Sequence, residues 1–276
     1  MFRWGGAFLV VAFVGGFLAH AAEARPERIV SINLCADQLL LLLVEPSRIR
    51  SLSYYALDPE ESYFAERAKP FPINHVTADE VLAFEPDIVL AGSYTSRSTV
   101  DLLKRRGVHV VELPVPTTLT EVRAQFLEVA ELLDARPKAE GLLAEMTERL
   151  EAVSARVKNT QKPLAAVYFA NGLTAGKGTL MDDVMRVAGI ENLAGRLGIE
   201  GYGSLSLERL LVSQPDMIIL GQLSPESPSL ARLVLEHPAF RLLHAHAKTV
   251  AVPRRLWTCW GPFTAEWVER LAEARP

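Results

Sequence analysis

Cysteine is scarce in this sequence of 276 residues, which contains two, Cys35 and Cys259. Two cysteines are too few for a zinc framework, and they allow one intramolecular disulfide at most. The sequence also lacks blocks of like charge, and its formal net charge is −4. This balance argues against a general nucleic-acid binder. With 49% hydrophobic and 22% charged residues, the composition is that of a globular protein with room for two modest domains.

Long hydrophobic runs are missing except at the N-terminus. Residues 5–19 are apolar and uncharged, they follow Arg3, and small-x-small cleavage sites end at Ala21 and Ala24. The run is shorter than the ~20 residues that a membrane-spanning helix needs, which favours a cleaved signal over a membrane anchor. We expect residues 1–24 to be a signal peptide, cleaved after Ala21 or Ala24, and the mature protein to lie in the periplasm.

Two segments of the chain repeat the same pattern. Residues 79–92 and 208–221 align without a gap, at an offset of 129 residues (208 − 79). Both begin with an acid, carry Pro-Asp at the eighth and ninth positions, and end with glycine. Each segment predicts a short helix that ends at the proline, then a buried strand, then a turn. One such unit in each half of the chain indicates two similar α/β lobes.

Between the two repeats lies a helical stretch, residues 118–158. A capping box, formed by Thr118 and Glu121, predicts the start of a first helix. Pro137 interrupts that helix and suits the first turn of a second one, where a backbone N–H is not required. The second helix, residues 137–158, would be roughly 33 Å long and could join the two lobes.

The alternation of strand and helix patterns on both sides of this stretch predicts an α/β fold. We expect two Rossmann-like lobes with parallel sheets, joined by the long helix, with a ligand cleft between them. The corresponding division is an N-terminal lobe at 25–117, a helical segment at 118–160 and a C-terminal lobe at 161–276. Within the second lobe, residues 170–178 are expected to form a loop between a strand and a helix.

Candidate ligand contacts follow from the sheet geometry, because ligands of parallel α/β sheets lie outside the carboxyl ends of the strands. The candidates are Asn33, Leu34, Cys35, Tyr54, Tyr55, Tyr94 and Arg97 in the first lobe, and Phe169, Asn171, Tyr202, Arg254, Arg255, Trp257 and Trp260 in the second. This mixture suits a large polycyclic ligand through stacking, cation–π contacts and bidentate hydrogen bonds. Arginines facing the cleft would favour an anionic chelate such as a ferric siderophore, whereas aromatic residues alone would favour a corrinoid.

The order and spacing of several segments resemble a known family. These segments are residues 28–33, the paired Pro-Asp units, residues 178–184 and 188–192, and the terminal residues 257–262. Over nearly all of the mature chain they resemble class III periplasmic substrate-binding proteins of ABC importers, which serve cobalamin, ferric siderophores and haem. The resemblance implies a monomer that has no catalytic residues and no cofactor of its own. Such a protein binds a chelate of cobalt or iron between its lobes, and the lobes close only a little when it does so.

The same family docks onto arginines of the inner-membrane ABC permease through one exposed acid on each lobe. Matched residue by residue, these acids are Asp79 and Glu208. The family usually has glutamate at both places, so Glu80 is a second candidate for the contact made by the first lobe. The alternative is that these acids only stabilise the N-termini of their helices.

Two other functions are alternatives. An exported enzyme could use the cleft, but no predicted strand end carries a histidine and no Gly-x-Ser-x-Gly elbow is present. A receptor for bare zinc or manganese would need several histidines, whereas His244 and His246 are a single pair, so we predict no metal site. The cysteines leave three possibilities open: a disulfide across the cleft, sulfur contact with a bound metal, or free thiols.

Overall fold

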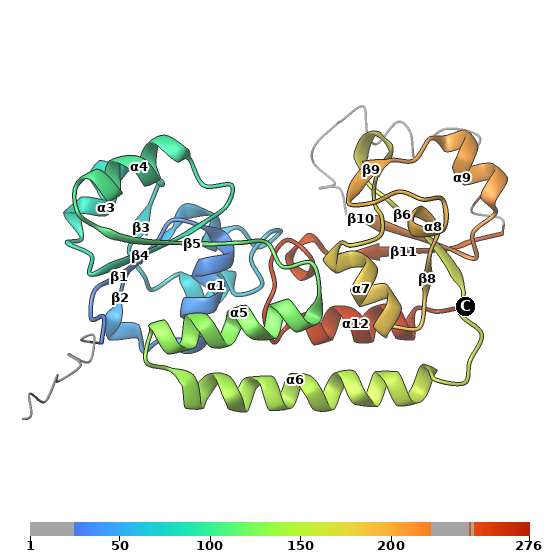
Figure 1. Ribbon diagram of the computed structural model, residues 1–276, viewed down its shortest axis with the longest axis horizontal. Helices are drawn as coiled ribbons and strands as arrows, with labels where there is room; N and C mark the ends of the chain where they lie inside the picture. Colours follow the sequence, from blue (N-terminus) through green and yellow to red (C-terminus); the bar gives the residue numbers. More distant parts are fainter. Residues whose placement is uncertain (1–24, 222–242, 244–245) are drawn as a thin grey trace, which may run out of the picture.

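The computed structural model describes residues 25–221, 243 and 246–276, and it contains two α/β lobes (Figure 1). The lobes lie side by side along the longest axis of the molecule, above a long helix that runs beneath both. The predicted signal peptide and His244 lie outside the described residues. In the described part of the chain, no helix is both long enough and apolar enough to cross a membrane.

The N-terminal lobe is built on a five-stranded parallel sheet in the order β3-β2-β1-β4-β5. Its strands are β1 (Ile29–Ser31), β2 (Ile49–Ser53), β3 (Ile73–Asn74), β4 (Ile88–Gly92) and β5 (His109–Leu113). Its helices are α1 (Leu34–Leu43), α2 (Ala65–Ala68), α3 (Ala78–Ala83) and α4 (Arg97–Arg105), with 3₁₀ turns η1 (Pro46–Arg48) and η2 (Tyr54–Leu57). All residues of α1 are buried, which its run of leucines allows.

The C-terminal lobe contains a four-stranded parallel sheet in the order β11-β10-β6-β8. Its strands are β6 (Leu164–Tyr168), β8 (Glu191–Asn192), β10 (Met217–Gly221) and β11 (Lys248–Val252). Its helices are α7 (Leu180–Val187), α8 (Leu193–Arg196), α9 (Leu207–Ser213) and α12 (Thr264–Glu273), with 3₁₀ turns η3 (Ala170–Gly172) and η4 (Arg254–Leu256). The predicted α/β fold, with a parallel sheet in each lobe, is confirmed.

The predicted loop at residues 170–178 is wrong in part. It contains β7 (Leu173–Ala175), which pairs antiparallel with β9 (Tyr202–Ser204) in a separate two-stranded sheet. Three residues are too few to show a strand-like alternation in the sequence. The partner strand follows only after α7 and α8, so nothing local indicates the pairing.

The two Pro-Asp units perform the same structural task in each lobe. The Asp87 carboxylate accepts the backbone N–H groups of Glu27 and Arg28, at 3.0 and 2.9 Å, shortly before β1. The Asp216 carboxylate accepts the N–H of Leu164, at 2.8 Å, at the first residue of β6. Because β4 pairs with β1 and β10 pairs with β6, each aspartate ties together the starts of two neighbouring strands.

The helices of the two units also end in the same way. Glu85 follows α3 and Gln214 follows α9, and both have a left-handed backbone, with φ of 47° and 44°. A left-handed residue ends a helix and turns the chain, here directly before the proline. The repeat in the sequence is therefore a repeat of one helix–turn–strand unit.

Two consecutive helices connect the lobes, as the sequence predicts. At the start of α5 (Leu119–Leu132), the Thr118 hydroxyl accepts the N–H of Glu121 at 3.1 Å. The chain then turns at Asp134, which has a φ of 54°, and α6 (Arg136–Val157) has proline in its first turn. With 22 residues, α6 is roughly 33 Å long and passes beneath both lobes (Figure 1).

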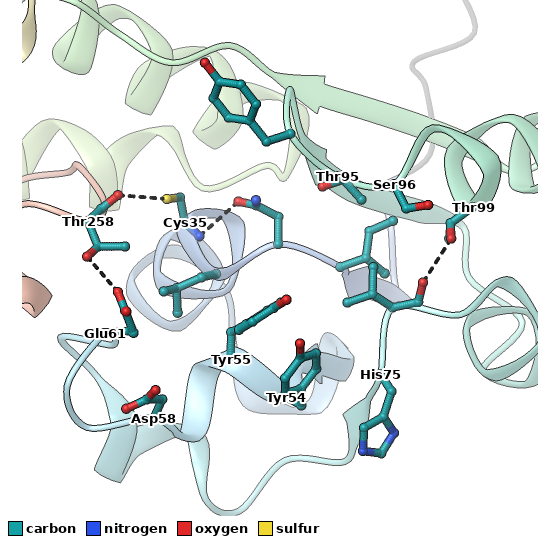
Figure 2. A pocket seen from close by; sticks show the side chains of 15 residues that line it. Cys35, Tyr54, Tyr55, Asp58, Glu61, His75, Thr95, Ser96, Thr99 and Thr258 are labelled. Atoms are coloured by element: carbon teal, nitrogen blue, oxygen red, sulfur yellow. Dashed lines mark hydrogen bonds between the residues drawn. The ribbon is translucent and has the colours of Figure 1, made fainter. Parts of the chain in front are cut away.

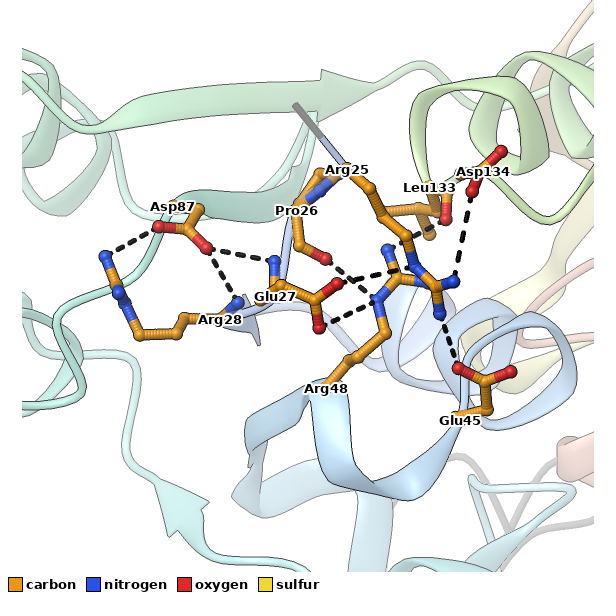
Figure 3. A network of polar contacts seen from close by, with 9 residues as sticks. All are labelled: Arg25, Pro26, Glu27, Arg28, Glu45, Arg48, Asp87, Leu133 and Asp134. Carbon is orange, nitrogen blue, oxygen red and sulfur yellow. Dashed lines mark hydrogen bonds and ion pairs between the residues drawn. The ribbon is translucent and has the colours of Figure 1, made fainter. Parts of the chain in front are cut away.

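The turn between α5 and α6 is fastened to the N-terminal lobe by a buried arginine (Figure 3). The side chain of Arg48 is 3% exposed, and its guanidinium donates to the carbonyl oxygens of Pro26 and Leu133, at 2.8 and 2.9 Å. Arg25 adds an ion pair with Glu45 at 2.5 Å. These contacts hold residues 25–26, η1 and the end of α5 together. The helical connection between the lobes is therefore fixed to the N-terminal lobe.

A buried carboxyl group lies in the core of the N-terminal lobe. Asp37, in the first turn of α1, is fully buried and accepts the N–H of Ser53 at 3.0 Å as well as the Ser53 hydroxyl. Burial disfavours the charged form and raises the pKa of Asp37 from 3.8 to about 7, although hydrogen bonds from Ser31 and Ser53 lower it. At pH values between 3.8 and about 7, folding therefore shifts the carboxyl group toward its protonated form.

We predict that Asp37→Asn flattens the dependence of stability on pH. Because the folded pKa lies above the unfolded one, the stability contributed by the protonated group is fully present below about pH 3.8 and is lost as the pH rises to about 7. Urea unfolding across this window should show the free energy of unfolding of the wild type falling, relative to the variant, by roughly 1–4 kcal/mol. Parallel profiles for the two proteins would contradict the prediction.

Candidate ligand-binding site

A pocket of about 620 Å³ lies at the carboxyl ends of four strands of the N-terminal lobe (Figure 2). It is lined by residues that follow β1, β2, β3 and β4, together with Thr258 from near the other end of the chain. Six predicted ligand contacts are among them: Asn33, Leu34, Cys35, Tyr54, Tyr55 and Tyr94. The volume falls within the range of roughly 300–1,000 Å³ that is typical of small-molecule sites.

Asn33 is held in place by the fold. Its side-chain oxygen accepts the N–H groups of Cys35 and Ala36, at 3.0 and 3.3 Å, and so caps α1. Gly92, at the end of β4, lies directly against the amide, since a Cβ there would be 2.5 Å from Asn33 Nδ2. The cap and this close approach fix the orientation of Asn33 before any ligand is bound.

Aromatic rings form one wall of the pocket. Tyr54 and Tyr55, in η2, have ring centroids 3.9 Å apart, and they are 40% and 44% exposed. The ring of Tyr54 also stacks on His75, with centroids 5.7 Å apart and an interplanar angle of 24°. This wall offers flat faces with hydroxyl and imidazole edges, a combination that suits a large conjugated ligand.

His75 is a lining residue that the sequence prediction missed. It directly follows β3, so the expectation that no strand end carries a histidine is wrong. β3 has two residues, too few for a sequence pattern to predict. The Glu80 carboxylate accepts the backbone N–H of His75 at 2.5 Å, the main reason why the pKa of Glu80 is lowered. It also lies 3.2 Å from His75 Nδ1, which restrains the imidazole.

A second, smaller pocket of about 70 Å³ is lined by residues of the C-terminal lobe together with Val115 and Pro116, which follow β5. Four predicted contacts line it: Phe169, Tyr202, Trp257 and Trp260. The rings of Phe169 and Trp257 pack against each other, with centroids 4.9 Å apart. Trp267 lines the pocket too, so every tryptophan beyond residue 24 belongs to this one wall. Thr258 lines both pockets, which places them next to each other.

Two exposed tyrosines come from opposite lobes. Tyr94 follows β4 and is 90% exposed, whereas Tyr202, in β9, is 65% exposed. Partial burial of its hydroxyl raises the pKa of Tyr202, and the nearby Tyr94 raises it further. Tyr94 lines the first pocket and Tyr202 lines the second.

Two of the predicted arginine contacts are paired with glutamates. Four predicted contacts line neither pocket: Arg97, Asn171, Arg254 and Arg255. Arg97 pairs with Glu112 at 3.0 Å, and its side chain is 74% exposed on α4. Arg254 pairs with Glu61, which itself lines the first pocket. A strand end can be found from the sequence, but the acidic neighbour that holds an arginine side chain becomes visible only in the fold. As ligand contacts these four residues stay predictions.

A disulfide joins Cys35, at the start of α1, to Cys259, which precedes α12. The Cα atoms are 5.1 Å apart, although the cysteines are 224 residues apart in the chain. Of the three possibilities that the sequence leaves open, the structure contains the disulfide, and the described residues include no free cysteine. The Cys35 sulfur also lies 3.7 Å from the carbonyl oxygen of Thr258, a residue of both pockets (Figure 2).

Polar contacts beside the disulfide reinforce this connection. Glu61, which follows η2 in the N-terminal lobe, forms an ion pair with Arg254. It also accepts the hydroxyl of Thr258 at 2.9 Å (Figure 2). We call residues 254–266 the C-terminal clamp, because they hold the end of the chain against the first pocket.

Aromatic packing secures the far end of the C-terminal clamp. The ring of Tyr63 stacks on Phe263, with centroids 4.8 Å apart, and its hydroxyl donates to Glu266. Burial raises the pKa of Tyr63 to about 12, and the hydrogen bond to Glu266 adds to this effect. Beyond the clamp, Arg149 of α6 makes a bidentate contact with Glu269 of α12, at 2.8 and 2.5 Å. The lobes are therefore connected at two levels, by α6 and by the clamp.

The predicted docking acids differ in their surroundings. Asp79, in the first turn of α3, is exposed, and its side chain has no hydrogen bond or ion pair among the described residues. The carboxylate of Glu80 is engaged by His75, which leaves Asp79 as the more accessible acid. Glu208 is exposed in the first turn of α9. Both helices lie on the side of the molecule that faces away from α6 (Figure 1).

The described residues contain no group of three or more histidine, cysteine or carboxylate side chains that could hold a metal ion. His244, half of the histidine pair noted in the sequence, lies outside them. Aromatic, aliphatic and hydroxyl groups dominate both linings. Pocket walls of this kind suit an organic ligand better than a bare metal ion.

Comparisons with known proteins give the same architecture. Residues 29–252 match the family model described as periplasmic binding protein. A cobalamin-binding protein of Halobacterium salinarum is 25% identical over 209 residues, which are 74% of this chain and 56% of that protein. The chain thus spans little more than half the length of the curated relatives that it matches.

Solved structures share the fold. The periplasmic heme-binding protein RhuT from Roseiflexus sp. RS-1, in apo form, has a TM-score of 0.75 at 22% identity, covering 90% of this chain and 97% of that one. A periplasmic heme-binding protein from Pseudomonas aeruginosa has a TM-score of 0.73 at 22% identity, covering 90% and 92%. At these identities the likeness establishes the fold alone. Because the family match extends over most of the chain, the protein belongs to the periplasmic binding protein family.

Proposed function

We propose that this protein works in the periplasm, where it captures a metal chelate between its lobes and delivers it to an inner-membrane ABC permease. The observation that carries the proposal is the pair of adjoining pockets at the facing sheet edges, both walled by aromatic side chains. Aromatic faces bind conjugated ligands by stacking, so capture requires no chemical conversion. The ligand brings its own metal, and the protein supplies no cofactor.

Among metal chelates, a corrinoid fits the linings best. An anionic ferric siderophore would call for arginines that are free to pair with it. Arg97 is paired with Glu112, outside both linings, and Arg254 is paired with Glu61 of the first pocket, so both guanidinium groups already have an anionic partner. The rings of both pockets offer stacking faces, and their hydroxyl groups offer neutral hydrogen bonds. The similarity to a protein named for cobalamin binding supports the same choice. A ferric siderophore is the alternative ligand class.

We predict that cyanocobalamin binds to the mature protein and quenches its tryptophan fluorescence. Quenching is expected because Trp257, Trp260 and Trp267 all line the second pocket. Tyr94→Ala should weaken binding by roughly 2- to 10-fold, since the variant removes one stacking face. Isothermal titration calorimetry would give the affinity of each protein.

Val212→Ala is the control, because Val212 is 85% exposed on α9 and lines neither pocket. Its affinity should equal that of the wild type. If no corrinoid, ferric siderophore or haem produces heat or quenching, capture of a metal chelate is wrong.

We further propose that Asp79 and Glu208 contact the permease. Charge reversal at both positions, Asp79→Lys with Glu208→Lys, should abolish transport in vesicles that contain the permease, because like charges would then face the permease arginines. The affinity for the ligand should stay unchanged, since neither acid lines a pocket. Glu151→Lys, an exposed acid on α6, is the matched control. Normal transport by the double variant would refute this assignment.

A further inference from the structure

The linings of the two pockets carry little charge. Among the described residues, neither lining contains a lysine or an arginine. The only carboxylates there are Asp58 and Glu61, both in the first pocket. Glu61 is neutralised, because it forms an ion pair with Arg254 and accepts the Thr258 hydroxyl. One negative charge, that of Asp58, has no cationic partner in the part of the chain that the structure describes.

The turn that follows η2 places this carboxylate beside the pocket (Figure 2). One carboxylate oxygen of Asp58 accepts the N–H of Glu60 at 2.9 Å, and the Asp58 N–H donates to the carbonyl oxygen of Tyr55 at 3.2 Å. The second carboxylate oxygen has no hydrogen-bond partner among the described residues. The turn therefore fixes the acid and leaves one oxygen available to a donor on a ligand.

We infer that the site selects among metal chelates by their peripheral charge, with Asp58 as the residue that sets the preference. It takes chelates whose rim carries neutral amides or a cationic group, and it discriminates against chelates that carry carboxylates or catecholates. This inference rests on the proposed capture of a metal chelate and narrows its ligand class.

The physical reason is the balance between dehydration and pairing. A carboxylate on the ligand loses water when it enters an aromatic pocket, and no lysine or arginine of either lining replaces that water. At Asp58, an exposed residue of the first lining, it would also meet a like charge, which repels it and whose effect weakens as salt is added. An amide or ammonium group of the ligand can instead donate to the available Asp58 oxygen, and such charge-assisted hydrogen bonds are the stronger ones.

The test compares four probes on the mature protein by calorimetry: cyanocobalamin, whose rim carries amides, cationic ferrioxamine B, and the anions haemin and ferric enterobactin. The wild type should bind one or both of the first two probes and bind the two anions at least about tenfold more weakly. Asp58→Lys should improve the relative affinity for the anions by about tenfold, and Asp58→Asn should give an intermediate value. Asp101→Lys on α4 makes the same charge change away from both pockets and should alter nothing.

Three outcomes separate this inference from the function on which it rests. Preference for the neutral or cationic probes, reduced by Asp58→Lys and shrinking as salt is added, supports the inference. Tight binding of an anionic probe that Asp58→Lys does not change overturns the inference but leaves capture of a chelate intact. Failure of all four probes to bind overturns both.

Discussion

The disulfide between Cys35 and Cys259 is the constraint on which the arrangement of the site depends. It ties the start of the first buried helix to a segment 224 residues further along the chain. Closing so long a loop removes about 5 kcal/mol of conformational freedom from the unfolded chain in the entropic account of disulfides. In the folded protein the bond lies next to Thr258, which lines both pockets, so together with the contacts of the C-terminal clamp it helps to keep the pockets adjacent.

The C-terminal clamp and α6 together make the relation between the lobes stiff. Motion about a single hinge requires one flexible connection, but these lobes are joined below by a continuous helix and beside the pockets by the clamp. The contact between Arg149 of α6 and Glu269 of α12 joins these two connections to each other. A site that is already assembled spends little free energy on ordering when a ligand binds, which suits capture by stacking on fixed rings.

Local signals predicted much of the fold and the edge at which the site lies. The end of a helix before each Pro-Asp pair, the Thr118 cap and the proline at the start of α6 each act within a few residues, so their consequences can be read from the sequence. The carboxyl ends of the strands then follow from the parallel topology, and ten predicted contacts line the two pockets.

The missing parts depend on contacts between distant segments. His75 follows a two-residue strand that exists because it pairs with β2, and β7 exists because it pairs with β9. Arg97 and Arg254 occur at the right edge, but Glu112 and Glu61 determine where their guanidinium groups point. The disulfide likewise needs the fold, since spacing alone does not decide between a bond and free thiols.

The most direct test of this account is the distance between the lobes with and without a ligand. Spin labels at positions 101 on α4 and 212 on α9 report that distance by pulsed electron paramagnetic resonance, since both positions are exposed. For two lobes joined at two levels, the distance distribution should shift by less than about 2 Å when cyanocobalamin is added. A shift of many ångströms, as in hinge closure, would show that the clamp and α6 do not hold the lobes, and it would contradict the account.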